Sequence, residues 1–287
     1  MTLPPLIVNA ALTGMVPMRE DSPEVPLTPE EIVADAERVH EAGASIVHLH
    51  ARDEDGLPTY RRDVYERIVA GVRERCPDLI VCVSTSGRVF KSFEERSEVL
   101  DLESDLKPEM ASLTLGSLNF PRQASVSEPE MIRRLAGKMK ERGIVPELEV
   151  FDLGMVDFAK FLIERGVLEP PFYFNILLGS LGTLSATPFH LSTVVQSLPP
   201  AATWAGAGIG RFQLYVNSMA VTMGGHVRVG LEDSLWLDAE KTRPATNAGL
   251  VERLVALAGA VERDVATPAQ TRELIGLPAR VPAGAAS

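Results

Sequence analysis

Eight short apolar runs rich in β-branched residues recur along the chain, and helix-like stretches separate them. The runs cover 5–12, 45–50, 79–85, 109–115, 145–151, 172–178, 202–208 and 226–232. Runs of this length and composition are typical of buried strands in a parallel sheet. Their regular alternation with helices predicts an α/β fold in which helices cover the sheet.

The clearest helix signal lies in residues 28–43, TPEEIVADAERVHEAG. Thr28 is expected as the N-cap, Pro29 occupies the first helical position and Glu31 completes a capping box. Gly43 provides a stop signal after the last turn. These features predict a helix between the first and the second strand.

Thr187 and Thr267 each precede a proline and start further helices, the second of which follows the eighth strand. The chain shows no long linker, low-complexity tract or internal duplication. We therefore predict a single (β/α)8 TIM barrel over residues 1–287, with an extra C-terminal helix. An open doubly wound sheet is the alternative, but the turn after the first run lacks the glycine-rich phosphate-binding fingerprint.

Charge and cysteine content narrow the partners and the compartment. The formal net charge is −11, and charges of both signs are scattered rather than clustered. This pattern argues against a nucleic-acid surface or an anionic membrane as the partner. The chain has only two cysteines, no apolar run long enough to cross a membrane and no signal-peptide pattern, so we expect a soluble cytoplasmic protein.

Alternation along the strands indicates which side chains point into the barrel. In the run 226–232 the odd-numbered residues are apolar and belong on the helix side, so Arg228 and Glu232 point inward. The same rule directs these polar side chains inward on other strands: Asn9, His48, His50, Ser84, Ser112, Thr114, Glu147, Glu149 and Asn175. Unpaired buried charge costs several kcal/mol, so this polar interior calls for compensation such as a divalent cation.

His48 and His50 end the second strand, and Glu232 ends the eighth, with only the first strand between them. All three side chains are therefore expected at the carboxyl-terminal mouth of the barrel. Two imidazoles and one carboxylate form an open three-ligand set suited to Zn²⁺. The sequence thus predicts a zinc site with positions left for substrate oxygens.

Several of these polar residues also have a structural interpretation. Glu147 and Glu149 either pair with Arg228 or contact a substrate. Asn9 is of a type that commonly braces other groups through hydrogen bonds. His226 begins the eighth strand, far from the mouth, which favours a structural role.

The residues present also bear on three other function classes. A Schiff-base aldolase needs a lysine near a strand end, whereas all six lysines fall in expected helices or loops. A zinc-dependent hydrolase remains the alternative, although strands five and six add no histidine ligands. Arg228 close to Glu232 and Asp233 argues against a non-catalytic binding barrel.

Seven ordered motifs resemble the β-keto acid cleavage enzymes. They are NAALTG, ASIVHLHARDEDG, STSGR, MASLTLGSLNF, PELEVFDLGM, AGAGIGRFQ and GGHVRVGLEDS. The resemblance extends from about residue 6 to residue 275. It implies a zinc-dependent (β/α)8 barrel, usually a homotetramer, that converts a β-keto acid and acetyl-CoA into acetoacetate and a new acyl-CoA.

The resemblance also implies residue roles. His48, His50 and Glu232 match the zinc ligands, and Arg228 with Asp233 matches the pair tied to proton abstraction. Ser84 matches a residue that contacts the substrate carboxylate, and Ser112 matches a hydroxyl residue of the pocket. We expect the remaining substrate contacts from Thr114, Asn9, Glu149, Val16 and Gly116.

One position departs from the family pattern. Members that cleave an aminohexanoate carry a glutamate where this chain has Val16, and valine cannot pair with an amino group. We therefore expect a substrate with an uncharged or apolar tail, unless Glu20 or Asp21 in the same loop substitutes. Arg88 and Arg211 follow strands three and seven, where they are placed to meet CoA phosphates or to form local salt bridges.

Overall fold

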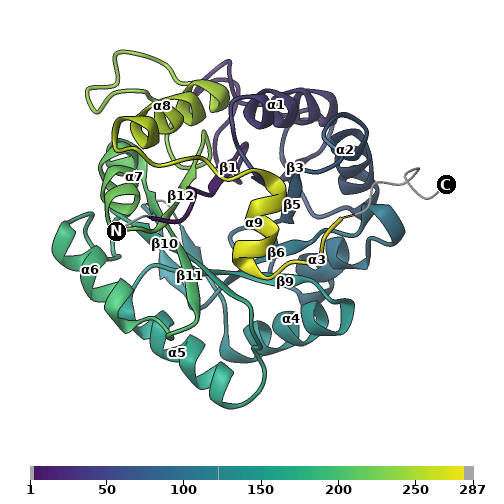
Figure 1. The fold of residues 1–287 in the computed structure, drawn as a ribbon. Helices are drawn as coiled ribbons and strands as arrows, with labels where there is room; N and C mark the ends of the chain where they lie inside the picture. The colour runs from purple at the N-terminus through teal and green to yellow at the C-terminus, as the bar shows by residue number, and fades with distance from the viewer. Residues whose placement is uncertain (1–2, 122, 281–287) are drawn as a thin grey trace.

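The computed structural model describes residues 3–121 and 123–280, and its centre is a closed parallel barrel (Figure 1). Neighbouring strands follow the order β1-β12-β11-β10-β9-β6-β5-β2. The strands are β1 (Val8–Ala11), β2 (Ile46–Leu49), β5 (Ile80–Val83), β6 (Met110–Thr114), β9 (Val145–Val150), β10 (Phe172–Leu178), β11 (Ala202–Gly208) and β12 (His226–Val229). The predicted single (β/α)8 barrel is confirmed.

Helices form the outer wall of the barrel and follow the strands in turn (Figure 1). They are α1 (Pro29–Glu41), α2 (Arg62–Arg75), α3 (Phe93–Ser97), α4 (Pro129–Arg142), α5 (Leu153–Glu164), α6 (Pro188–Ser197), α7 (Gln213–Thr222), α8 (Asn247–Ala260) and α9 (Pro268–Ile275). The last of these is the predicted extra C-terminal helix. Among the residues that the structure describes, no helix combines the length and apolarity needed to cross a membrane.

The predicted start of α1 is present in atomic detail. The Thr28 side chain accepts a hydrogen bond from the Glu31 amide, and the Glu31 side chain accepts one from the Thr28 amide. Thr267 caps α9 with the same reciprocal pair of bonds, to Gln270, and the Thr187 side chain caps α6 by accepting from the His190 amide; each threonine is followed by a proline. Local sequence chemistry therefore sets these helix starts before any tertiary packing is considered.

Two short hairpins extend the loops after β2 and β6. They pair β3 (Ala51–Arg52) with β4 (Pro58–Thr59), and β7 (Leu118–Asn119) with β8 (Ala124–Ser125). These two hairpins were not predicted from the sequence. Both lie at the carboxyl-terminal side of the barrel strands, where loops of a TIM barrel surround the functional site.

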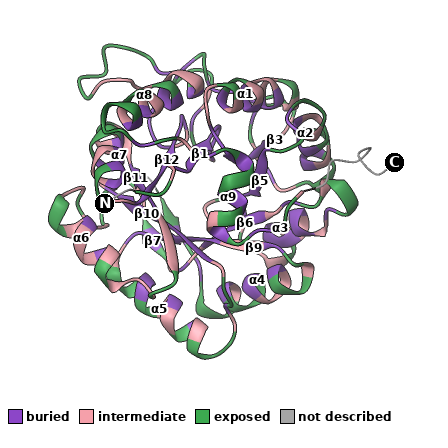
Figure 2. Cartoon of the chain, viewed as in Figure 1, coloured by how far each residue is buried: buried purple, intermediate pink, exposed green. Residues whose placement is uncertain are grey.

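The interior of the barrel is buried throughout, while exposed residues lie on the outward faces of the helices (Figure 2). Its amino-terminal half forms an apolar layer that we call the floor. The floor consists of Ile7, Ile46, Ile80, Cys82, Met110, Tyr173, Ala205, Ala266, Ile275 and Leu277. The polar inner residues lie above this floor, two positions further along the same strands.

Helix α9 closes the floor from below, and it crosses the barrel end in Figure 1. Ile275 packs into the floor, and Thr271 Oγ1 donates to Ser45 Oγ at 2.8 Å. Arg272 donates to Glu109 at 2.8 Å. The extra helix is therefore part of the core rather than an appendage.

The eighth strand is shorter than predicted. It ends at Val229 rather than at Glu232, because Gly230 adopts a φ of +155° and turns the chain. A Cβ atom at Gly230 would lie 2.0 Å from the Ala11 carbonyl oxygen, so only glycine permits this approach. The turn still returns Glu232 to the mouth, where its amide donates to the same Ala11 oxygen at 3.2 Å.

Candidate active site

Three predicted ligand side chains meet at the carboxyl-terminal mouth. His48 Nε2 lies 3.2 Å from His50 Nε2, and Glu232 Oε1 lies 3.3 Å from His50 Nε2. The other Glu232 oxygen is 3.8 Å from His48 Nε2. A tetrahedral zinc ion with bonds of about 2.0–2.1 Å separates its ligand atoms by roughly 3.3–3.4 Å, so the three groups fit such an ion.

The charge states of Glu232 and His50 also suit a cation. Burial alone would raise the pKa of Glu232, but Arg228, His50 and His48 hold it well below its usual range. Burial lowers the pKa of His50, which favours the neutral imidazole that binds metals. Within the described residues, Glu232 Oε2 is buried and has no hydrogen-bond partner. An ionised carboxylate with a free oxygen beside two imidazoles is a donor set for zinc.

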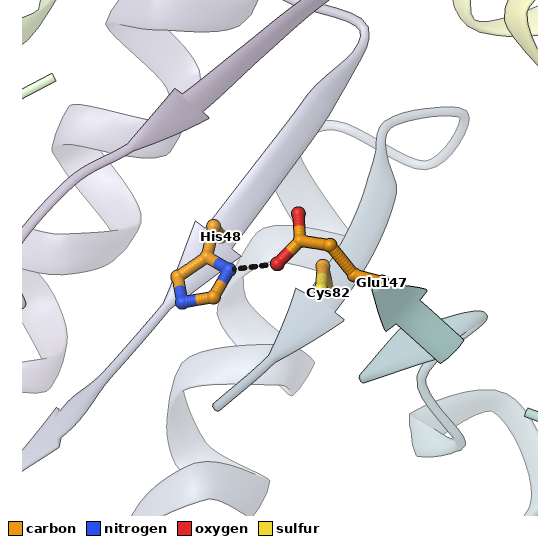
Figure 3. A group of neighbouring side chains, drawn as sticks. All are labelled: His48, Cys82 and Glu147. Carbon is orange, nitrogen blue, oxygen red and sulfur yellow. Dashed lines mark hydrogen bonds and ion pairs between the residues drawn. The ribbon is translucent and has the colours of Figure 1, made fainter. Parts of the chain in front are cut away.

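A carboxylate beneath the mouth supports the first histidine. Glu147 Oε2 lies 2.7 Å from His48 Nδ1, as the dashed line in Figure 3 marks. Glu147 Oε1 accepts a hydrogen bond of 2.6 Å from Asn9 Nδ2. The pKa of Glu147 is below its usual range because His48, Arg228 and Asn9 together outweigh the effect of burial.

Arg228 is fully buried and connects the acidic groups of the site. Its Nε donates to Asp233 Oδ2 at 3.1 Å, and its Nη1 donates to Glu149 Oε1 at 3.1 Å. Its Nη2 lies 2.9 Å from Glu232 Oε1. Burial raises the pKa of Asp233 although Arg228 acts in the opposite direction. A buried carboxylate with a raised pKa, oriented by a fixed cation, is suited to accept a proton.

These groups lie at one end of a cavity of about 330 Å³. Its polar wall consists of His48, His50, Ser84, Ser86, Arg88, Ser112, Thr114, Ser125, Glu149, Ser180, Arg228, Glu232 and Asp233. Its apolar wall includes Met15, Val16, Pro17, Leu118, Phe120, Pro121, Phe151, Leu177, Leu181 and Ile209. The cavity is large enough for a small organic acid and is lined by both polar and apolar side chains.

Most residues expected to contact substrate lie on this wall. Ser84 and Ser112 expose hydroxyl groups to it, and Thr114 donates to Glu149 Oε2 at 2.7 Å. Val16 lines the cavity from the loop after β1. Arg88 also lines it, with its guanidinium carbon 3.5 Å from the centre of the Phe120 ring.

Three expected contact residues lie elsewhere among the described residues. Asn9 is fully buried below the cavity, where it braces Glu147. Gly116 packs against α5, and a Cβ atom there would lie 3.1 Å from Met155. Arg211 lines an adjoining cavity of about 210 Å³ behind the mouth. Alternation along a strand indicates its inner face but not the depth of a residue along the barrel axis, which explains the position of Asn9. Gly116 and Arg211 lie beyond the strand ends, where alternation gives no guidance.

One buried residue near the site was not predicted from the sequence. Cys82 lies on β5 next to His48 and Glu147, and it is fully buried (Figure 3). The signal was available, because Cys82 is two residues before Ser84 and shares its inward face. The sequence also left Glu147 between two roles, and the structure gives it His48 and Asn9 as hydrogen-bond partners.

The fold and this site define a TIM-barrel protein with a candidate metal centre at the face where such barrels carry their active sites. A family model described as beta-keto acid cleavage enzyme matches residues 5–277, and the chain belongs to this family.

The chain is similar to several known proteins. It is 41% identical to the 3-keto-5-aminohexanoate cleavage enzyme of Acetoanaerobium sticklandii, over 95% of this chain and 98% of that protein. It is 39% identical to the 3-oxoadipate:acetyl-CoA acetyltransferase of Cupriavidus necator, over 96% and 95% of the two chains. The apo structure of ObcA has the same fold, with a TM-score of 0.80 and 24% identity over 89% of this chain and 66% of that one.

Proposed function

We propose that this protein is a zinc-dependent β-keto acid cleavage enzyme that uses acetyl-CoA as its second substrate. The products would be acetoacetate and the acyl-CoA of the remaining part of the β-keto acid. The observation that carries the proposal is the position of His48, His50 and Glu232 beside the Arg228–Asp233 pair at the end of one cavity. The names of the two relatives, which cleave or acetylate keto acids, support the same reaction class.

His48, His50 and Glu232 would hold the zinc ion, which supplies a Lewis acid for the oxygen on which negative charge develops. Asp233 removes the acidic proton between the two carbonyl groups of the substrate. Arg228 fixes the Asp233 carboxylate through its Nε, so the base keeps its orientation toward the cavity.

The resulting carbanion attacks the thioester carbonyl of acetyl-CoA and expels the CoA thiolate, which then adds to the former keto carbon of the substrate. Cleavage of the original carbon–carbon bond leaves the new thioester, and the protonated Asp233 returns its proton to the released carbanion to give acetoacetate. Ser84 and Ser112 place hydroxyl groups on the cavity wall, where Ser84 binds the substrate carboxylate and Ser112 lines the substrate pocket. Thr114 and Glu149 complete the polar wall on the same side.

The substrate tail is expected to be uncharged or apolar. Val16 lies on the cavity wall beside Met15 and Pro17, and it offers no charge to an amino group. Neither Glu20 nor Asp21 is among the described residues that line the cavity. Asp21 instead accepts a hydrogen bond of 3.0 Å from the Met18 amide, so it supports its own loop.

Two arginines are assigned to CoA. Arg88 lines the main cavity, and Arg211 lies in the adjoining cavity, which shares Glu232 and Asp233 with it. A thioester at the reaction centre would extend its phosphates toward the loops at this face. Arg88 and Arg211 are therefore the cations proposed to contact the CoA phosphates.

The test is to incubate the purified protein with a panel of β-keto acids, with and without acetyl-CoA, and to measure acetoacetate and acyl-CoA. We expect product only when both substrates are present, and loss of turnover after chelation that added zinc restores. Cleavage without acetyl-CoA would favour the alternative, a zinc-dependent hydrolase of a β-dicarbonyl acid. That alternative rests on the H-x-H pair of His48 and His50, which also suits zinc-activated water.

The assembly proposed from the family is a homotetramer in the cytoplasm. Its support in this chain is a set of exposed apolar side chains on consecutive helices: Phe161 on α5, Phe189 on α6 and Tyr215 on α7. Both cysteines are free and buried, in keeping with a reducing compartment. Light scattering of the purified protein measures the assembly directly.

A further inference from the structure

A second group of potential ligands lies directly below the mouth. His48, Cys82 and Glu147 bring one donor atom each to within 4.8 Å of one another, and all three side chains are buried. Figure 3 shows them converging from the strands β2, β5 and β9. This group is either a second metal site or a support for the first, and its contacts decide between the two.

The existing contacts of these groups disfavour a second cation at this position. His48 Nδ1 and Glu147 Oε2 lie 2.7 Å apart in a hydrogen bond, which an ion bound between them would have to break. Arg228 Nη1 also lies 3.4 Å from His48 Nδ1 and 3.8 Å from Glu147 Oε2. In addition, burial raises the pKa of the Cys82 thiol well above its usual range, which disfavours the thiolate that metals bind.

The hydrogen bonds of Glu147 favour the supporting role. One carboxylate oxygen lies 2.7 Å from His48 Nδ1, and the other accepts from Asn9 Nδ2 at 2.6 Å. An ionised carboxylate can only accept, so the proton of a neutral His48 must be on Nδ1. Nε2 then carries the lone pair and faces His50 and Glu232.

We propose that Glu147, held in place by Asn9, is a positioning residue that fixes the tautomer and ring orientation of His48 for zinc binding. The inference rests on the proposed zinc site and adds the group that prepares one of its ligands. Carboxylates placed behind a metal-binding histidine raise its basicity, and their loss commonly weakens metal binding by about 10–100-fold. Glu147 acts through His48 and lies outside the described cavity wall.

The experiment compares zinc affinity in the full-length wild-type protein and two matched variants, by competition with a chromophoric chelator. Glu147→Gln keeps the side-chain volume but removes the charge and one acceptor, and we expect an affinity loss of about 10–100-fold. Cys82→Ala alters the same buried group without touching the His48 hydrogen bond, and its affinity should equal that of wild type. Zinc analysis at saturation should give one ion per chain in all three proteins.

Two further readouts separate positioning from a general structural effect. Long-range ¹H–¹⁵N spectra should show His48 protonated on Nδ1 in wild type, and a mixture of tautomers in the metal-free Glu147→Gln protein. If that variant does not fold, Asn9→Ala tests the same carboxylate by removing its brace. We expect Asn9→Ala to weaken zinc binding in the same direction, with a smaller loss.

Unchanged zinc affinity in Glu147→Gln would overturn the proposal. A zinc content of two ions per chain that falls to one in both variants would also overturn it, in favour of a second metal site. Failure of the proposed function is distinguishable from either result, because zinc affinity is measured without turnover. A wild-type protein that cleaves no β-keto acid but loses zinc affinity with Glu147→Gln would retain the inference.

Discussion

The lower and upper halves of the barrel interior are built on the same strands but differ in chemistry. On β2, Ile46 belongs to the apolar floor, while His48, two residues later on the same face, belongs to the polar site. Ile7 and Asn9 show the same change on β1. One step of about 6.6 Å along a strand therefore separates packing from candidate chemistry.

The two halves differ in how tightly each atom is specified. In the floor, contacts are apolar and non-directional, so their contribution depends on the area and volume that they fill. In the upper half, the Arg228 guanidinium contacts the carboxylates of Glu149, Glu232 and Asp233. Both carboxylate oxygens of Glu147 also have a hydrogen-bond partner. Burying charged groups costs free energy. Apolar burial in the floor and in the helix-facing core must therefore offset the free-energy cost of the upper half.

The first prediction tests the upper half and has the largest expected effect. Replacing Asp233 by Asn removes the proposed base but keeps the side-chain volume next to Arg228. We expect kcat to fall by about 10²–10⁴-fold, the range for loss of a general base, while zinc content stays at the wild-type level. Retained turnover would remove Asp233 from the base role, and lost zinc would show that it supports Glu232 instead.

The second prediction applies a comparable perturbation to the floor. Ile275 of α9 belongs to the floor and is 1% exposed, so Ile275→Ala deletes buried methyl groups. We expect the free energy of unfolding to fall by about 2–4 kcal/mol, without a change in zinc affinity. Urea unfolding and chelator competition measure the two quantities. A variant with normal stability but weakened zinc binding would contradict the division between the two halves.

The fold was predictable because its signals are local and repeated. Capping at Thr28, Thr187 and Thr267 and alternation along the strands depend on residues close in sequence. The position of α9 under the floor was not predictable, because it depends on contacts such as Thr271 with Ser45, 226 positions apart. Sequence periodicity carries no information about such docking.

The inward face of the candidate site was also predictable, but its pairings were not. Alternation placed Glu147 and Glu149 inside the barrel without indicating their partners. In the structure Glu147 pairs with His48, and Glu149 accepts a hydrogen bond from Arg228. The stagger between strands determines which side chains lie at the same height along the barrel axis. The turn at Gly230, which replaces the predicted end of β12, likewise depends on contact with Ala11 of β1, a neighbouring strand that is distant in sequence.

The third prediction concerns pH and the floor end of β12. Burial, together with Arg263, lowers the pKa of His226 to about 3, and the ring accepts a hydrogen bond of 3.0 Å from the Ile7 amide. In the unfolded chain the ordinary histidine pKa is about 6.5. Below that pH the unfolded state binds a proton that the folded state does not, so stability present above pH 6.5 is lost as pH falls toward 3.

Between pH 7 and 5.5 this group should contribute a loss of about 1 kcal/mol in the free energy of unfolding. Urea titrations at the two pH values measure it, and His226→Gln serves as the control because its amide oxygen can still accept from Ile7. The variant should lose about 1 kcal/mol less than wild type over this interval. Equal losses in the two proteins would show that His226 is protonated in the folded state.

The fourth prediction sharpens the contrast at the rim of the upper half, where the side chains are neither packed like the floor nor fixed like Arg228. Val16 lines the cavity but is 44% exposed, so substitution there should leave stability and zinc content unchanged. Val16→Glu should raise kcat/KM for β-keto acids with an amino group on the tail, by up to about 5-fold, because solvent-exposed ion pairs contribute at most about 1 kcal/mol.

The comparison uses amino-bearing and alkyl β-keto acids of equal length, with Val16→Gln as a control that adds polarity without charge. A gain with glutamate but not glutamine, confined to the amino-bearing acid, assigns Val16 to tail selection by charge. If neither variant changes the preference, the loop after β1 does not contact the tail. Selectivity would then depend on the wall formed by Phe120 and Leu181 on the opposite loops.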